Sequence, residues 1–64
     1  MRYRIELADD LLQVLDEDGN GHDAHVVRRD GADAAEQKID EWAAAYRIDP
    51  APAKRELRHL IRRM

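Results

Sequence analysis

The second half of the chain, from Asp33 to Met64, has the pattern of two amphipathic helices joined by a tight corner. In the first helix, apolar residues recur every three or four positions with charged residues between them, which predicts one buried face. Trp42 is the largest apolar residue of that face, and we expect it at the centre of the core. The apolar positions are Ala35, Ile39, Trp42, Ala43 and Tyr46.

Residues that favour helix ends mark the expected limits of both helices. Asp33 is a good N-cap, and Glu36 follows three residues later, as in a capping box. Residues 47–49 make the corner. Asp49 is expected to cap the second helix, with Pro50 at its first position, where no backbone N–H is needed.

The second helix has an apolar stripe beside a cationic one. We expect the apolar stripe to face the core, and its members are Ala53, Leu57, Leu60, Ile61 and Met64. The cationic residues lie on the adjoining face, and they are Lys54, Arg55, Arg58 and Arg62.

The first half of the chain reads as a small β platform for these helices. Residues 2–7 alternate between apolar and charged side chains, which predicts a half-buried strand. A short apolar run at 11–15 predicts a second, antiparallel strand, and the Gly- and Asp-rich residues 16–21 predict a turn. Residues 22–29 leave two alternatives open, a third strand or a short helix that reaches Asp30 and Gly31.

We therefore predict an α+β fold, a small antiparallel sheet of two or three strands followed by two packed helices, with a winged-helix-like arrangement as one form. The 64 residues make a single domain, with a β platform at 1–29 and a helix pair at 33–64. Without cysteine, packing must stabilise so small a core, and a weak homodimer would help. Nothing resembles a signal peptide or membrane span, so a cytoplasmic protein is expected.

Catalytic and metal-binding patterns are weak. The chain has no Ser, Thr or Cys to act as a nucleophile, so we expect no enzyme and no cofactor. Residues 16–21 match the opening half of an EF-hand calcium loop, but Val27 stands where the closing glutamate is needed, which favours an acidic turn. His22 and His25 lack a third ligand at fixed spacing, so no metal site is predicted.

Charge is divided unevenly between the two halves. Residues 1–33 carry a net charge of −5 and residues 34–64 a net charge of +2. The cationic helix therefore suits an acidic peptide or protein partner. A second helix after a tight corner is also typical of helix-turn-helix proteins, yet the acidic first half would repel a phosphate backbone, so nucleic acid is less favoured.

The second half also resembles PqqD-like proteins, the elements that recognise precursor peptides in ribosomal peptide natural-product pathways. The resemblance covers about half the chain. It rests on an Asp-Gly step at 30–31, a helix that ends near Tyr46, an Ile-Asp-Pro corner at 48–50 and the apolar spacing of the last helix.

The resemblance implies a three-stranded sheet before three helices, with the leader peptide added as a strand between the third strand and the last helix. Lys54, Arg58, Ile61 and Arg62 would then line the cleft. Residues 22–27, which include Val26 and Val27, would supply the strand edge. Arg55 is also predicted to bind the partner, because it belongs to the cationic stripe of the last helix. The leading hypothesis is a non-enzymatic peptide- or protein-binding module. The alternatives are a small phage-type inhibitor of a host protein complex and a small helix-turn-helix nucleic-acid-binding protein.

Overall fold

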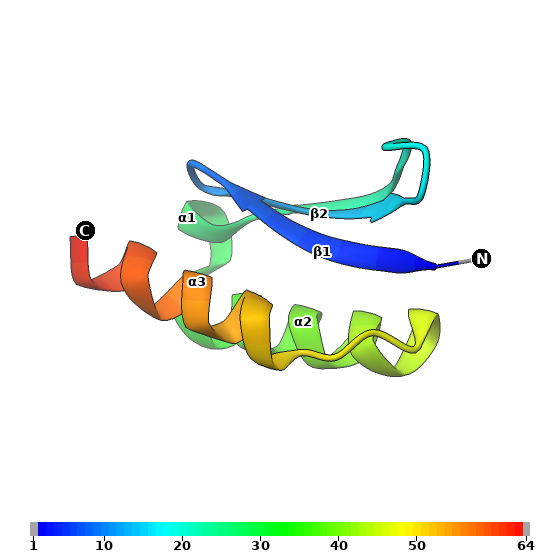
Figure 1. The fold of residues 1–64 in the computed structure, drawn as a ribbon. Helices are drawn as coiled ribbons and strands as arrows, with labels where there is room; N and C mark the ends of the chain where they lie inside the picture. The colour runs from blue at the N-terminus through cyan, green and yellow to red at the C-terminus, as the bar shows by residue number, and fades with distance from the viewer. Residues whose placement is uncertain (1, 64) are drawn as a thin grey trace.

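The protein is a two-layer α+β structure, which confirms the predicted fold class (Figure 1). The structure is a computed structural model and describes residues 2–63. Three strands come first and three helices follow. The elements are β1 (Tyr3–Ala8), β2 (Leu11–Asp16), β3 (Gly21–Val26), α1 (Val27–Asp30), α2 (Ala32–Tyr46) and α3 (Ala51–Arg63).

The sheet is antiparallel, with β2 between β1 and β3. β1 and β2 pair in an unbroken register, from Tyr3 opposite Asp16 to Ala8 opposite Leu11, and a two-residue turn connects them. The β2–β3 ladder is irregular, because its register shifts next to Val14. Both outer strands keep one edge without a partner strand among the described residues.

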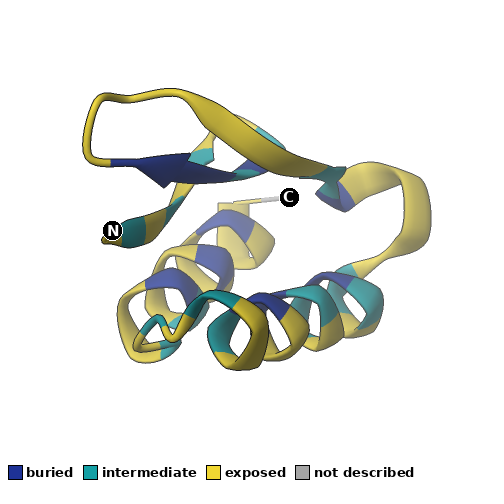
Figure 2. Ribbon diagram, turned by 90° about the vertical axis from the view of Figure 1, so that its right-hand side faces the viewer, coloured by how far each residue is buried: buried dark blue, intermediate teal, exposed yellow. Residues whose placement is uncertain are grey.

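The helix pair covers one face of the sheet, with α3 along β1 and α2 beneath β3 (Figure 1). The apolar stripes of both helices meet alternate residues of the central strand, Leu12 and Val14, and Figure 2 shows buried residues on both layers where they face each other. One hydrophobic cluster results. Its buried members are Leu12, Val14, Val27, Ala35, Ile39, Trp42, Ala53, Leu57 and Leu60.

Residues 22–29 contain both of the structures predicted as alternatives. β3 continues to Val26, and α1, a single helical turn, starts at Val27. The N–H of Val27 donates to the carbonyl oxygen of Asp10 at 2.8 Å, and its side chain is 1 % exposed. The chain therefore leaves the sheet where a valine enters the core.

The predicted N-cap of the first long helix is wrong. α2 begins at Ala32, after Gly31, and no side chain caps it. Asp33 lies within the first turn, where its charge still suits the helix dipole. Gly31 has φ +90° and ψ 173°, a conformation open essentially to glycine alone, and this turn sets the start of the helix.

Asp49 acts at the start of α3 as predicted, because its Oδ1 accepts a hydrogen bond from the N–H of Ala51 at 3.1 Å. The helix begins at Ala51, one residue after the proline expected to open it. Met64, predicted in the apolar stripe, lies outside the described residues. None of the described helices is both long and apolar enough to cross a membrane.

Candidate functional site

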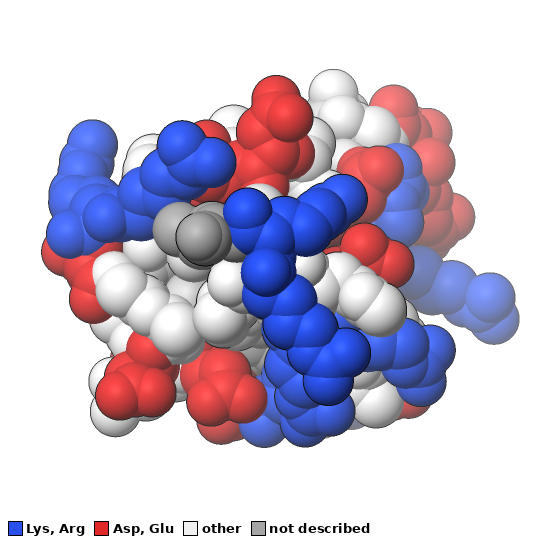
Figure 3. Space-filling model, turned by 90° about the vertical axis from the view of Figure 1, so that its left-hand side faces the viewer, with Lys and Arg blue, Asp and Glu red and all other residues white. Residues whose placement is uncertain are grey.

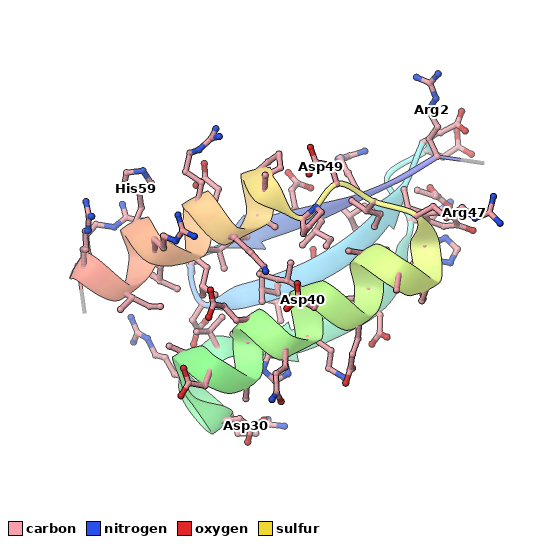
Figure 4. All side chains as sticks on the ribbon, turned by 90° about the horizontal axis from the view of Figure 1, so that it is seen from below. Arg2, Asp30, Asp40, Arg47, Asp49 and His59 are labelled. Carbon is pink, nitrogen blue, oxygen red and sulfur yellow. The ribbon has the colours of Figure 1, made fainter. Side chains whose placement is uncertain are left out.

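A groove lies between β1, the corner that joins α2 to α3, and the first turn of α3. We call it the β1 groove; its volume is about 510 Å³. In Figure 4, Arg2 and Arg47 lie at the same end of the molecule, and Asp49 lies nearer its middle, just before α3. Apolar side chains dominate the lining and charged ones complete it. The lining residues are Tyr3, Ile5, Tyr46, Ile48, Pro52 and Ala53, with Arg2, Arg4, Arg47 and Asp49.

The corner is held by backbone hydrogen bonds. Arg47 adopts the left-handed conformation, with φ 56° and ψ 52°, and its N–H donates to the carbonyl oxygen of Ala43. The N–H of Ile48 donates to the same oxygen at 3.0 Å. This αL cap ends α2 and turns Ile48 back against the core, where it is half-buried and lines the β1 groove.

Tyr3 and Tyr46 make an aromatic wall of the β1 groove. Their ring centroids lie 4.9 Å apart, and the rings of Tyr3 and His22 make a T-shaped contact with centroids 5.0 Å apart. The Nε2 of His22 lies 2.8 Å from Oδ2 of Asp16. The position of the wall is thus tied to the acidic turn that follows β2.

Asp16 is the organising residue of that turn. Its Oδ1 accepts hydrogen bonds from the N–H groups of Asp18 and Asn20, at 2.9 and 3.0 Å. The hydrogen bond with His22, then those with the backbone, lower the pKa of Asp16 from 3.8 to about 2. Oδ1 of Asp16 is thus bonded within the turn and Oδ2 contacts His22 of β3, so its carboxylate holds an acidic turn closed against the neighbouring strand.

The two histidines considered as metal ligands take different positions. His22 contacts Asp16, whereas His25 lies opposite Leu12 in the sheet and is half-buried. The Nε2 of His25 is buried without a hydrogen-bond partner among the described residues. Within residues 2–63 no three His, Asp or Glu side chains are grouped so that they could hold a metal ion.

The cationic residues of α3 form a surface separate from the β1 groove. Lys54 faces α2, with its Nζ 2.7 Å from Oδ1 of Asp40 (Figure 4). Arg55, Arg58 and Arg62 are exposed, and each lacks an ion pair within 4.0 Å among residues 2–63. Figure 3 shows basic side chains gathered at the end of the molecule where α3 finishes, with acidic groups on both sides.

The apolar stripe of α3 is narrower than predicted. Ala53, Leu57 and Leu60 are buried as expected, but Ile61 is 38 % exposed. Ile61 lies one step outside the helix arc that meets the core, beside Arg58 and Arg62. The expectation that Ile61 faces the core is therefore wrong, and the cationic surface of α3 has an apolar residue in it.

The residues predicted to line one cleft lie in separate places. Val26 is half-buried at the end of β3, and Val27 is in the core. α3 runs along β1, whereas β3 has α2 beneath it. The edge of β3 and the cationic surface of α3 therefore lie at opposite lateral edges of the molecule, one beside each outer strand of the sheet.

The residues of the β1 groove were not among the predicted site residues. Arg2, Arg4 and Ile5 were assigned only to a half-buried strand, and Tyr46 only to the helix stripe. The alternation of arginine with apolar residues at the start of the chain was the available signal. What the sequence did not indicate is which strand would lie beside the last helix.

A scan of protein-family models, a search of curated proteins and a search of solved structures each found no match to the chain.

Proposed function

We propose that the protein is a non-enzymatic peptide-binding module that takes an extended acidic segment of its partner at the edge of β1 and in the β1 groove. The observation that carries this proposal is an apolar groove beside an unpaired strand edge. An added peptide strand gains backbone hydrogen bonds from such an edge, and alternate side chains of the peptide reach a pocket beneath it.

The exposure of β1 supports this site. Ile5 and Leu7 point toward the helix layer, yet they are only half-buried, while their neighbours Leu12 and Val14 on β2 are 0 % exposed. Apolar surface therefore remains along the outer edge of the sheet. A further strand at this position would cover it.

Charge supports an acidic ligand. Arg2, Arg4 and Arg47 border the β1 groove, against a single acid, Asp49. The side chain of Arg4 is on the face of β1 away from the helices, 3.7 Å from Glu6. An extended peptide directs successive side chains to opposite faces. A segment in which acidic and apolar residues alternate would place its carboxylates near Arg4 and its apolar side chains toward the groove.

The order of elements is also the order that the resemblance to precursor-peptide recognition elements implies, three strands and then three helices, with α1 reduced to a single turn. A leader peptide of a ribosomal precursor is therefore the partner we propose within the wider class of acidic peptides. On this proposal the peptide is added to β1, because that is the strand beside α3.

An NMR titration with two matched peptides tests this function. The first peptide alternates Val and Glu, the second alternates Val and Lys, and both are blocked at their ends. We expect the Val–Glu peptide to shift the amides of β1 and of residues 46–53, and the Val–Lys peptide to leave them in place.

Charge reversal sharpens the titration. Arg4→Glu should weaken binding of the Val–Glu peptide to the monomeric protein a few-fold, because one cross-strand charge pair contributes about 0.2–1 kcal/mol. Arg62→Glu makes the same change on α3 and should leave binding unchanged. Shifts confined to α3, or equal binding of both peptides, would contradict the proposal.

A second candidate function is inhibition of a folded partner that docks on α3. It is favoured by Ile61, the large hydrophobic side chain that the described residues leave exposed, and by the arginines beside it. Binding of a folded acidic partner would then be weakened by Arg62→Glu and not by Arg4→Glu. The same two variants thus separate the two functions.

A further inference from the structure

The edge of β1 has a charge pattern that is complementary to itself. Arg4 and Glu6 flank Ile5, lie on the sheet face away from the helices and are about half exposed, at 54 % and 55 %. When a second copy of β1 lies antiparallel with the two Ile5 residues opposite each other, Arg4 of each copy faces Glu6 of the other. Opposite charges directly across a strand pair are stabilising.

The backbone fits the same register. Ala8 and Leu11 close the two-residue turn between β1 and β2, and a pair that closes such a turn is hydrogen-bonded. Because hydrogen-bonded pairs alternate along an antiparallel ladder, Tyr3, Ile5 and Leu7 direct their N–H and C=O groups to the free edge. In the register centred on Ile5, these residues meet one another.

Neighbouring registers are less favourable. The registers centred on Arg4 or on Glu6 keep the same alternation of hydrogen-bonded pairs, but each places two like charges opposite each other, which is destabilising. The register centred on Arg4 also sets Arg2 opposite Glu6 of the other copy, so of these three registers the one centred on Ile5 is the one that pairs opposite charges without a pair of like charges. The register centred on Ile5 also sets Tyr3 of one copy beside Leu7 of the other, on the face that is half-buried. Charge, hydrogen bonding and apolar contact therefore agree on one arrangement.

The other free edge is less suited to pairing. β3 has an irregular ladder next to Val14, and α1 follows it directly. Bulges and short or interrupted edges are the devices by which proteins protect a strand from further pairing. β1 shows no such irregularity from Tyr3 to Ala8.

We propose that β1 pairs with β1 of a second copy, so that two chains form a continuous six-stranded sheet. The second copy then lies across the mouth of the β1 groove, so a peptide that binds at β1 must first displace the second copy. The proposed dimer is argued from the charges and backbone groups at the edge of β1, whereas the competition with peptide rests on the proposed function.

Sedimentation velocity over a wide range of concentration tests the dimer. The native chain should dimerise, and R4E and E6R should each be monomeric, because each places like charges at both symmetry-related positions. In a mixture of the two variants a heterodimer should form, since one chain then has two acids on this face and the other has two bases. Both variants keep a net negative charge, so simple attraction between whole molecules does not explain such a result.

The double variant R4E/E6R restores the pattern in exchanged form and should dimerise like the native chain. Far-UV circular dichroism establishes that each variant is folded. A native chain that stays monomeric, or a mixture of folded R4E and E6R that stays monomeric, overturns the proposal. Protection of the Ile5 amide from hydrogen exchange should also rise with protein concentration; protection that does not change overturns the edge-to-edge arrangement.

The Val–Glu peptide distinguishes this proposal from the function. Dissociation of the dimer by the peptide supports both. A dimer that the peptide leaves intact supports the pairing and contradicts peptide binding at β1. A monomer whose β1 amides shift with the peptide contradicts the pairing and supports the function.

Discussion

At the scale of single residues, stability rests on a few side chains whose burial is unequal along one helix. Leu57 is 1 % exposed and Ile61, one turn later, is 38 % exposed. The two residues differ little in size, so their environment decides what each contributes. The comparison gives a direct check of the helix orientation.

Leu57→Ala should lower the free energy of unfolding by about 2–5 kcal/mol, through lost burial and the cavity that remains. Ile61→Ala should cost less than about 1 kcal/mol, because water already reaches its side chain. Urea unfolding of both variants, followed by circular dichroism, measures the difference. Equal losses would mean that the helix is turned so that both residues face the core.

Asp16 makes the stability of the acidic turn depend on pH. Its folded-state pKa is about 2, below the ordinary value of 3.8, so the folded protein binds a proton less readily than the unfolded chain. The stabilisation is therefore complete above about pH 4 and is lost as the pH falls toward 2. Carboxyl NMR titration should show this group as the one that titrates near pH 2.

The variant Asp16→Asn removes that titration. Its urea midpoint should be lower than that of the native chain at pH 7, and the difference should shrink as the pH is lowered toward 2. Asp18→Asn, whose side chain makes no hydrogen bond among residues 2–63, is the matched control and should follow the native curve. A native-like midpoint for Asp16→Asn at pH 7 would contradict the assigned role.

At the scale of elements, Gly31 is the residue that separates α1 from α2. Its φ of +90° with ψ of 173° is closed to other residues, although a Cβ there would meet no atom within 4 Å. Gly31→Ala should therefore cost about 1–3 kcal/mol from backbone strain alone. Thermal unfolding measures this cost.

Gly21 is a matched control for that experiment. It has no positive φ, and a Cβ there would lie 4.0 Å from Leu15, an ordinary contact. Gly21→Ala should leave stability unchanged or raise it by up to about 1 kcal/mol, because alanine restricts the unfolded chain. If both alanine variants behaved alike, the conformation of Gly31 would not be what separates the helices.

The elements also mark how far the sequence could predict the fold. Two strands and both long helices follow from apolar spacing, because a strand beside a helix layer must alternate and a helix on a sheet must have one apolar stripe. The β3–α1 boundary does not, since Val26 and Val27 suit either structure. The boundary is decided only by the tertiary position of Val27, which lies in the core and whose N–H donates a hydrogen bond to the carbonyl oxygen of Asp10.

The candidate site was harder to predict than the elements. Strong signals, such as the arginines of α3 and the valines at the end of β3 and the start of α1, lie apart once the chain folds. Arg2 and Ile5 became site residues only because α3 packs along β1. Such pairing between the first strand and the last helix is a long-range choice, which apolar spacing within a segment does not encode.

At the scale of the whole molecule, the hydrophobic cluster joins the two halves that the sequence suggested. Leu12 and Val14 come from the sheet, and Ile39, Trp42 and Leu57 come from the helices. Neither half has a core of its own, and a domain of 64 residues has little stability to lose. The β platform and the helix pair should therefore fold only together.

Trp42 provides the measurement. Trp42 is 3 % exposed, and its Nε1 donates to Oδ2 of Asp23 on β3 at 3.0 Å, so its fluorescence reports on contact between the layers. Denaturant curves from tryptophan fluorescence and from far-UV circular dichroism should coincide, as they do for a two-state domain. Peptides that correspond to residues 1–31 and 32–64 should each be unfolded when alone. A peptide of residues 32–64 that kept its helices and a buried tryptophan would contradict the shared core, because the helix pair would then be a folding unit to which the sheet is only attached.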